Sequence, residues 1–125
     1  MAWSLGGLAD VARLRADYKR ATGMFKESLS HSQISGDKFG PPYVLEAMGL
    51  VAVALGDAKR AARLWGAASA WREAINQPLP RNYQRDYAAS ITQVRTQLGE
   101  EVYASAWSEG HMMSAEQAIA LALEE

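Results

Sequence analysis

The sequence contains no cysteine, which excludes disulfide frameworks and thiolate chemistry. Its two histidines, His31 and His111, stand far apart, and a metal site needs several clustered ligands, so we expect no metal ion. No apolar run approaches the roughly 20 residues that a membrane span needs. The N-terminus lacks the basic and apolar regions of a signal peptide. These absences predict a cytoplasmic protein that makes no membrane contact.

The polar residues form no recognisable catalytic set. Ser30 and His31 supply two of the three residue types of a nucleophile triad, but no strained turn surrounds them. Glu100 and Glu101 are adjacent, so on a helix they point about 100° apart and cannot converge on one atom. The glycine-rich phosphate loop of ATPases is also missing. We therefore expect no enzyme activity, no catalytic residues and no cofactor.

Lysine and arginine are absent after Arg95. Residues 99–125 hold six acidic residues and carry a net charge of −6, whereas residues 1–98 hold 13 basic and eight acidic residues and carry +5. A nucleic-acid-binding surface requires a much stronger basic bias than this. We expect no direct contact with nucleic acid.

Apolar residues recur at helical spacing, alanine is abundant, and there is almost no strand pattern. Glycine and proline clusters at residues 36–42 and 76–80 break the chain. Gly99 and Gly110 mark two further helix ends, and Ser114 with Gln117 has capping-box spacing. The pattern predicts an all-α chain of about seven helices, over residues 2–14, 18–32, 42–55, 58–75, 81–98, 100–109 and 115–123.

A stretch of the sequence recurs after forty residues. A fixed period of this size is typical of stacked helical hairpins that bury their apolar faces against one another. We expect a single α-solenoid domain with hairpins at 1–40 and 41–76 and capping helices at 80–125. The residues that recur are Leu5, Val11, Ala12, Asp17, Lys19, Arg20 and Ala21, which return as Leu45, Val51, Ala52, Asp57, Lys59, Arg60 and Ala61.

The two hairpins resemble tetratricopeptide repeats. Met48-Gly49 matches the Leu-Gly position of the first helix, and Gly56-Asp57-Ala58 matches the turn. Ala61 and Trp65 match the small and large positions of the second helix. The spacing of forty departs from the usual 34 residues. The resemblance implies a scaffold that binds a protein, a peptide or a neighbouring domain.

The second half is similar to the C-terminal region of large bacterial signalling ATPases, including LuxR-family transcriptional regulators and some adenylate cyclases. The blocks that carry the resemblance are residues 61–68, 72–73, 78–80, 98–101, 106–110 and 114–118, with Tyr87. It covers about residues 45–123. It implies that the chain is a piece of a longer regulator whose effector and nucleotide-binding domains lie upstream.

In such solenoids ligands lie on the concave face, which the first helix of each hairpin lines. Three polar residues on that face would set the register of a bound partner, and apolar ones would provide contact area. Aligning the repeats predicts that this face presents Asp10, Arg13, Leu14, Tyr43, Glu46, Leu50 and Val53.

Two alternatives remain open at this point. The first alternative to the interaction scaffold is a sensor for a small inducer, which would need an enclosed apolar pocket. The second is a purely structural cap. A homodimer through the first helix, near Trp3 and Leu8, is also expected. We assign the aromatic residues of the second half to the core rather than to a ligand cage; they are Trp65, Trp71, Tyr83, Tyr87, Tyr103 and Trp107.

Overall fold

The computed structural model describes residues 17–78 and 81–124, and for 81–86 the backbone alone. The described ranges are helical and contain no strand, which confirms the all-α prediction. None of their helices is long and apolar enough to cross a bilayer. The helix predicted over 2–14 lies outside the described residues. The helices are α2 (Tyr18–Ser35), α3 (Gly40–Ala54), α4 (Ala58–Ile75), α5 (Arg81–Leu98), α6 (Glu100–His111) and α7 (Ala115–Leu123).

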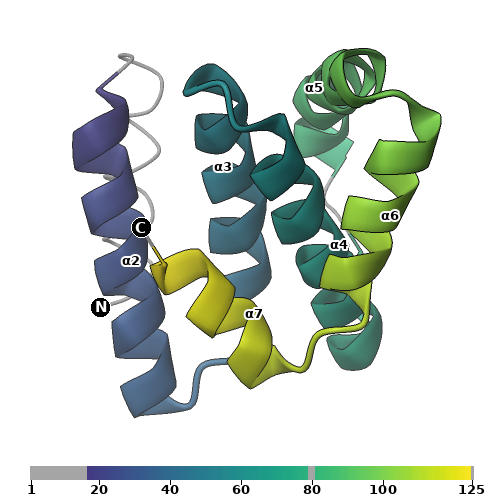
Figure 1. Ribbon diagram of the computed structural model, residues 1–125. Coiled ribbons are helices and arrows are strands. Elements are labelled where there is room, and N and C mark those ends of the chain that lie inside the picture. Colours follow the sequence, from purple (N-terminus) through teal and green to yellow (C-terminus); the bar gives the residue numbers. More distant parts are fainter. Residues whose placement is uncertain (1–16, 79–80, 125) are drawn as a thin grey trace.

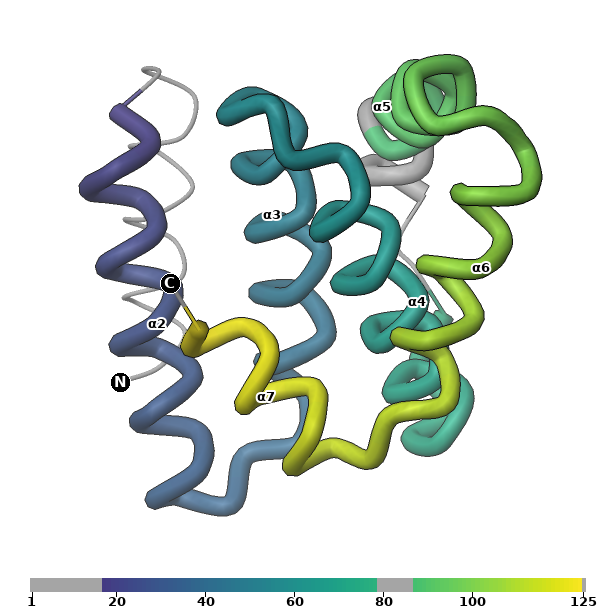
Figure 2. Tube along the Cα trace, viewed as in Figure 1, coloured from purple at the N-terminus to yellow at the C-terminus, as the bar shows by residue number. Residues whose placement is uncertain are grey.

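Helices α2, α3 and α4 stand side by side and alternate in direction (Figure 1). Helix α6 lies against α4, and α5 crosses near the end where α3 turns into α4 (Figures 1 and 2). The short α7 lies across the α2–α4 layer and contacts all three of its helices. Helix α4 contacts α3, α5, α6 and α7, so it is the centre of the fold.

Two of the predicted side-chain caps, at the starts of α4 and α7, are present in the structure. Asp57 accepts a hydrogen bond from the Arg60 N–H at 3.1 Å, and Gly56 before it has φ +86°, a backbone conformation that favours glycine. Ser114 and Gln117 form the predicted capping box at the start of α7. Asp17 precedes α2 as expected, but its side chain makes no cap hydrogen bond.

Two predicted helix ends were wrong. Helix α2 continues past Ser32 to Ser35, because the left-handed residue that closes it is Gly36, whose N–H donates to the Ser32 carbonyl at 2.9 Å. Helix α6 runs through Gly110 to His111 instead of stopping at Glu109. Gly110 is a buried contact residue within the helix rather than its terminator.

The buried side chains form two clusters that meet along α4. One joins α2, α3, α4 and α7, and the other joins α3, α4, α5 and α6. The sequence repeat of forty residues has a counterpart in the core, because α2 and α4 bury residues at equivalent positions of the repeat. The buried equivalents are Ala21 with Ala61, Phe25 with Trp65, and Ser28 with Ala68.

Helices α4 and α6 pack at backbone contact through two glycines. A Cβ atom on Gly66 would collide with the Trp107 carbonyl oxygen and lie 3.0 Å from the backbone nitrogen of His111. A Cβ atom on Gly110 would collide with the Arg63 carbonyl oxygen in the same way. Ala62 and Ala106, each four residues earlier on its helix, are fully buried. Small residues at this spacing let two helix axes approach closely.

Polar pairs bracket this contact. Arg63 donates to the Glu109 carboxylate at 2.7 Å, and His111 Nε2 lies 2.6 Å from Glu73 Oε2. Both pairs join α4 to α6 and lie at the solvent-facing edge, so each adds little by itself. Together with the glycines they set one register for the two helices.

Arg60 holds the C-terminal end of α7. Its guanidinium Nη2 donates to three backbone carbonyls, those of Leu121 at 3.0 Å, Ala122 at 3.2 Å and Glu124 at 3.2 Å. The last carbonyls of a helix lack partners within it and carry negative partial charge, which suits an arginine. Arg20, which occupies the position equivalent to Arg60 in the first repeat, is exposed.

We predict that Gly110→Ala lowers the free energy of unfolding by about 3 kcal/mol, because the new methyl group must push the α4 backbone away. Urea denaturation followed by circular dichroism measures this. Gly23→Ala is the matched control, since a Cβ there meets no atom within 4 Å. Gly23 lies inside α2, so alanine there should raise stability by about 0.5 kcal/mol. Equal stability of Gly110→Ala and the wild type would contradict the glycine contact.

We also predict that Arg60→Met releases α7 while the rest of the fold stays intact. Methionine keeps an apolar stem but removes the donors to three carbonyls, so amide hydrogen exchange over residues 118–123 should accelerate at least about tenfold. Arg20→Met provides the control and should leave exchange in α7 unchanged. Uniform exchange rates in the two variants would show that Arg60 does not hold the helix.

Candidate functional site

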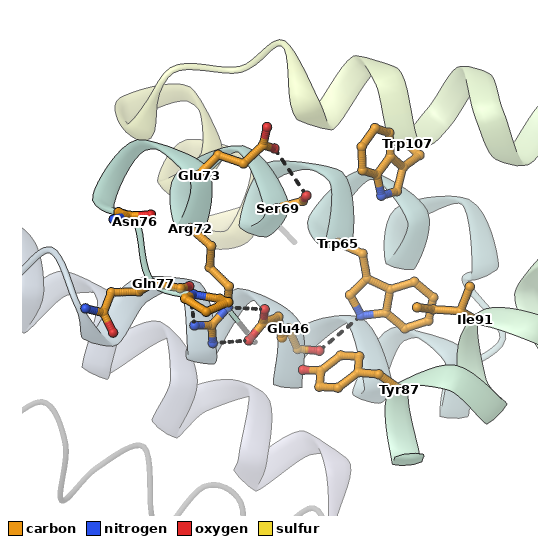
Figure 3. Close-up of a pocket in the computed structure, with 11 residues that line it drawn as sticks. Glu46, Trp65, Ser69, Arg72, Glu73, Asn76, Gln77, Tyr87, Ile91 and Trp107 are labelled. Carbon is orange, nitrogen blue, oxygen red and sulfur yellow. Dashed lines mark hydrogen bonds and ion pairs between the residues drawn. The ribbon is translucent and has the colours of Figure 1, made fainter. Parts of the chain in front are cut away.

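A cleft of about 480 Å³ opens between α3, α4, α5 and α6 (Figure 3). Its volume falls within the range of small-molecule sites, about 300–1,000 Å³. Helix α4 contributes four of the eleven described lining residues, more than any other helix, and the lining combines aromatic, charged and amide side chains. The described lining residues are Glu46, Trp65, Ser69, Arg72, Glu73, Asn76, Gln77, Pro78, Tyr87, Ile91 and Trp107.

A buried ion pair lies in the wall of the cleft. Glu46 is the one charged residue of α3, a helix that is otherwise apolar. Its two carboxylate oxygens accept hydrogen bonds from Arg72 Nε at 2.5 Å and Nη2 at 2.6 Å (Figure 3). The two side chains are only 8% and 13% exposed. This two-pronged geometry is the strongest form of an arginine–carboxylate pair.

Burial and pairing act on Glu46 in opposite directions. Loss of solvation in the wall raises the pKa of the Glu46 carboxyl, and the hydrogen bonds and positive charge of Arg72 counteract that rise. Arg72 Nη1 also donates to the Gln77 carbonyl at 3.2 Å, which ties the pair to the segment after α4. The positive charge of Arg72 is therefore matched within the protein.

Aromatic rings form the inner end of the cleft. Trp65 packs directly on Gly49 of α3, where a Cβ atom would collide with the indole, and its Nε1–H donates to the Glu46 carbonyl at 3.2 Å. The Tyr87 ring meets Trp65 edge-on, with ring centroids 6.2 Å apart and an interplanar angle of 76°. Both residues are at most 6% exposed, which agrees with their predicted core role.

The outer rim carries a tryptophan, a histidine and a carboxylate. Trp107 stacks on His111 with ring centroids 4.7 Å apart. Glu73 accepts hydrogen bonds from His111 and, at 3.4 Å, from Ser69. Both bonds end on Glu73 Oε2, and no described residue donates to Oε1. The Glu73 side chain is 64% exposed, so the second oxygen is accessible.

The predicted concave face is only partly represented in the structure. Asp10, Arg13 and Leu14 lie outside the described residues. Tyr43 packs against the first core cluster, whereas Leu50 and Val53 pack against the second, so these three do not share one cluster. The role predicted for Glu46, an exposed polar group that sets register, needs correction. Its side chain is buried and both of its oxygens are taken by Arg72.

Sequence reasoning missed the cleft because its parts come from four helices. The aromatic residues were noted, but nothing in their spacing places Trp107 near Glu73. Glu46 did offer a signal, since a single charge inside an apolar helix requires a buried partner. The sequence offers several arginines for that role, and only the packing of α3 on α4 selects Arg72.

We predict that Arg72→Met destabilises the fold by about 3 kcal/mol, because it leaves Glu46 buried without its cation. In this variant the folded-state pKa of Glu46 rises further above the unfolded value. The free energy of unfolding should then fall as the pH rises from about 5 to about 8. Urea denaturation across that range tests the slope.

The double variant Glu46→Leu with Arg72→Met serves as the control. It removes both charges together, so it should recover most of the lost stability and show no such pH slope. A double variant less stable than Arg72→Met alone would contradict this account of the pair.

Comparison with known proteins finds relatives among regulators. Over 83 residues, 66% of this chain, the sequence is 35% identical to proteins named "Putative HTH-type transcriptional regulator" from Mycobacterium tuberculosis and Mycobacterium bovis. The chain spans only 9% of the length of these relatives. No family model matches the chain, and no solved structure matches it. The chain is thus similar to a short stretch of much larger proteins that are named as transcriptional regulators.

Proposed function

We propose that this chain is a non-enzymatic interaction domain of a transcriptional regulator, and that it recognises a protein, a peptide or another domain of the same regulator. The observation that carries the proposal is the 35% identity over 83 residues to proteins named as HTH-type regulators. The matched stretch is 9% of those proteins, which leaves ample length for a separate DNA-reading domain. In this proposal the chain itself makes no contact with DNA.

The repeat class within this proposal is tetratricopeptide-like. Three antiparallel helices stand in a row, and the Gly49–Trp65 contact joins the Leu-Gly position of α3 to the large position of α4. The turn at Gly56-Asp57 caps α4 as that class requires. Equivalent burial in α2 and α4 gives further support. The resemblance of residues 45–123 to LuxR-family signalling ATPases supports a position near the C-terminal end of such a regulator.

A rigid scaffold suits recognition without chemistry. The α4–α6 glycine contact and the buried Glu46–Arg72 pair hold the surfaces of the domain in one arrangement before a partner arrives. Preorganisation of this kind reduces the ordering cost of binding. The mechanism in this proposal is non-covalent binding that is passed on to the rest of the regulator.

The cleft favours one second candidate, a sensor domain that binds a small inducer. Two helical hairpins alone are too few to enclose a ligand. The cleft is instead formed jointly by α3, α4, α5 and α6, so the helices after the hairpins supply part of its wall. Its mixture of buried aromatic rings and a few polar groups is typical of ligand sites.

A regulatory role predicts that unfolding this domain changes transcription in the source organism. We would introduce Gly110→Leu into the chromosomal gene to break the α4–α6 contact, with Gly23→Ala as the control that keeps the fold. RNA sequencing should show a limited set of transcripts changed at least about twofold in the first strain and none in the second. Identical transcript levels in both strains, with the protein present at equal amounts, would refute the proposal.

A further inference from the structure

The charges that line the cleft do not cancel. Among the described lining residues, Glu46 and Glu73 are acidic and Arg72 is the cation. Arg72 is already matched by Glu46 through two short hydrogen bonds. Among the residues whose side chains the structure describes, no lysine or arginine pairs with Glu73, and its partners are Ser69 and His111, both on Oε2. Its Oε1 accepts no hydrogen bond from any residue that the structure describes.

The apolar part of the lining is mainly aromatic. Trp65 and Tyr87 form the inner end, and Trp107 of α6 lies on the opposite side of Trp65 from Tyr87 (Figure 3). Trp107 stacks on His111, whose Nε2 lies 2.6 Å from Glu73. The faces of aromatic rings carry negative electrostatic potential, and tryptophan attracts cations more strongly than tyrosine or phenylalanine does. Trp65 and Tyr87 are at most 6% exposed, so Trp107 is the ring of the three that a guest can reach. A partly exposed tryptophan and an exposed carboxylate in one cleft favour a guest that carries positive charge on an apolar body.

From this juxtaposition we propose that the cleft is a binding site for a small, flat organic cation. The apolar body of the ligand lies against Trp107, the ring of the cleft that is not buried, and its charge faces Glu73. The buried Glu46–Arg72 pair fixes the wall without taking up the ligand's charge. This inference deepens the sensor candidate, but it concerns binding to the purified chain and does not depend on the effect on transcription.

The shape of the cleft alone would not favour a cation over a neutral ligand, because a neutral ring of the same shape would bury the same area. The positive charge adds the attraction of the rings and of Glu73. In a partly desolvated site this attraction is expected to change affinity by about tenfold. An anion of similar size would meet repulsion from Glu73 and from the ring faces.

The test is a titration of the ¹⁵N-labelled chain, followed by NMR, with three probes of similar size. The probes are 1-methylquinolinium, quinoline at a pH where it is neutral, and 2-naphthoate. The indole N–H signals separate the cleft from other surfaces, because Trp65 and Trp107 line it and Trp71 lines a different groove. We expect 1-methylquinolinium to shift the signals of Trp65 and Trp107 and to bind about tenfold tighter than quinoline.

Two matched variants assign the charge. Glu73→Gln keeps the shape of the side chain and should weaken 1-methylquinolinium binding about fivefold while leaving quinoline unchanged. Glu101→Gln makes the same change at an exposed residue of α6 outside the cleft and should alter neither affinity. The three probes are compared on the wild-type chain, so this comparison tests the proposal even if Glu73→Gln fails to fold.

Three results would overturn it: equal or tighter binding of quinoline or naphthoate, shifts confined to Trp71, or no binding of 1-methylquinolinium at millimolar concentration. Each can occur whether or not the domain regulates transcription. A failed titration therefore removes the cation site alone, and unchanged transcripts remove the regulatory role alone.

Discussion

The close approach of α4 and α6 is the constraint on which the rest of the molecule depends. Gly66 and Gly110 leave no room for any side chain between the two backbones. This contact fixes where α6 lies, and the chain must then cross from α4 through α5 to reach that position. The cleft is the space that this detour leaves between α5, α6 and the α3–α4 pair. The absence of side chains at Gly66 and Gly110 thus allows both the close helix packing and the cleft beside it.

The buried ion pair plays a different role. A buried pair is rarely a net source of stability, because removing two charges from water offsets most of their attraction. An apolar pair of similar volume would fill the same space between α3 and α4. The pair instead specifies geometry, since Glu46 and Arg72 satisfy each other in one register of these helices only. A wall in one fixed shape is what a binding surface requires.

Local patterns predicted the helices, and long-range packing decided everything else. Asp57 and Ser114 were identifiable as caps because a cap involves residues within one turn. Gly110 was misassigned because glycine serves equally well as a helix terminator and as a contact point between helices. Only the position of α4 distinguishes the two roles. Glu46 was placed on the correct helix but assigned to an open face, because no local pattern reveals that Arg72, twenty-six residues later, takes both of its oxygens.

The hydrogen bonds from Arg60 of α4 to the end of α7 have a consequence for the order in which the chain folds. Residues 99–125 contain no lysine or arginine, so the last helix has no basic side chain of its own to satisfy its terminal carbonyls. Its terminal carbonyls accept hydrogen bonds from Arg60 of α4 instead. A helix of nine residues is also too short to be stable on its own. The C-terminal segment is therefore ordered only after the middle of the chain is in place. Order in α7 thus reports that the Arg60 end of α4, more than fifty residues earlier in the sequence, has already folded.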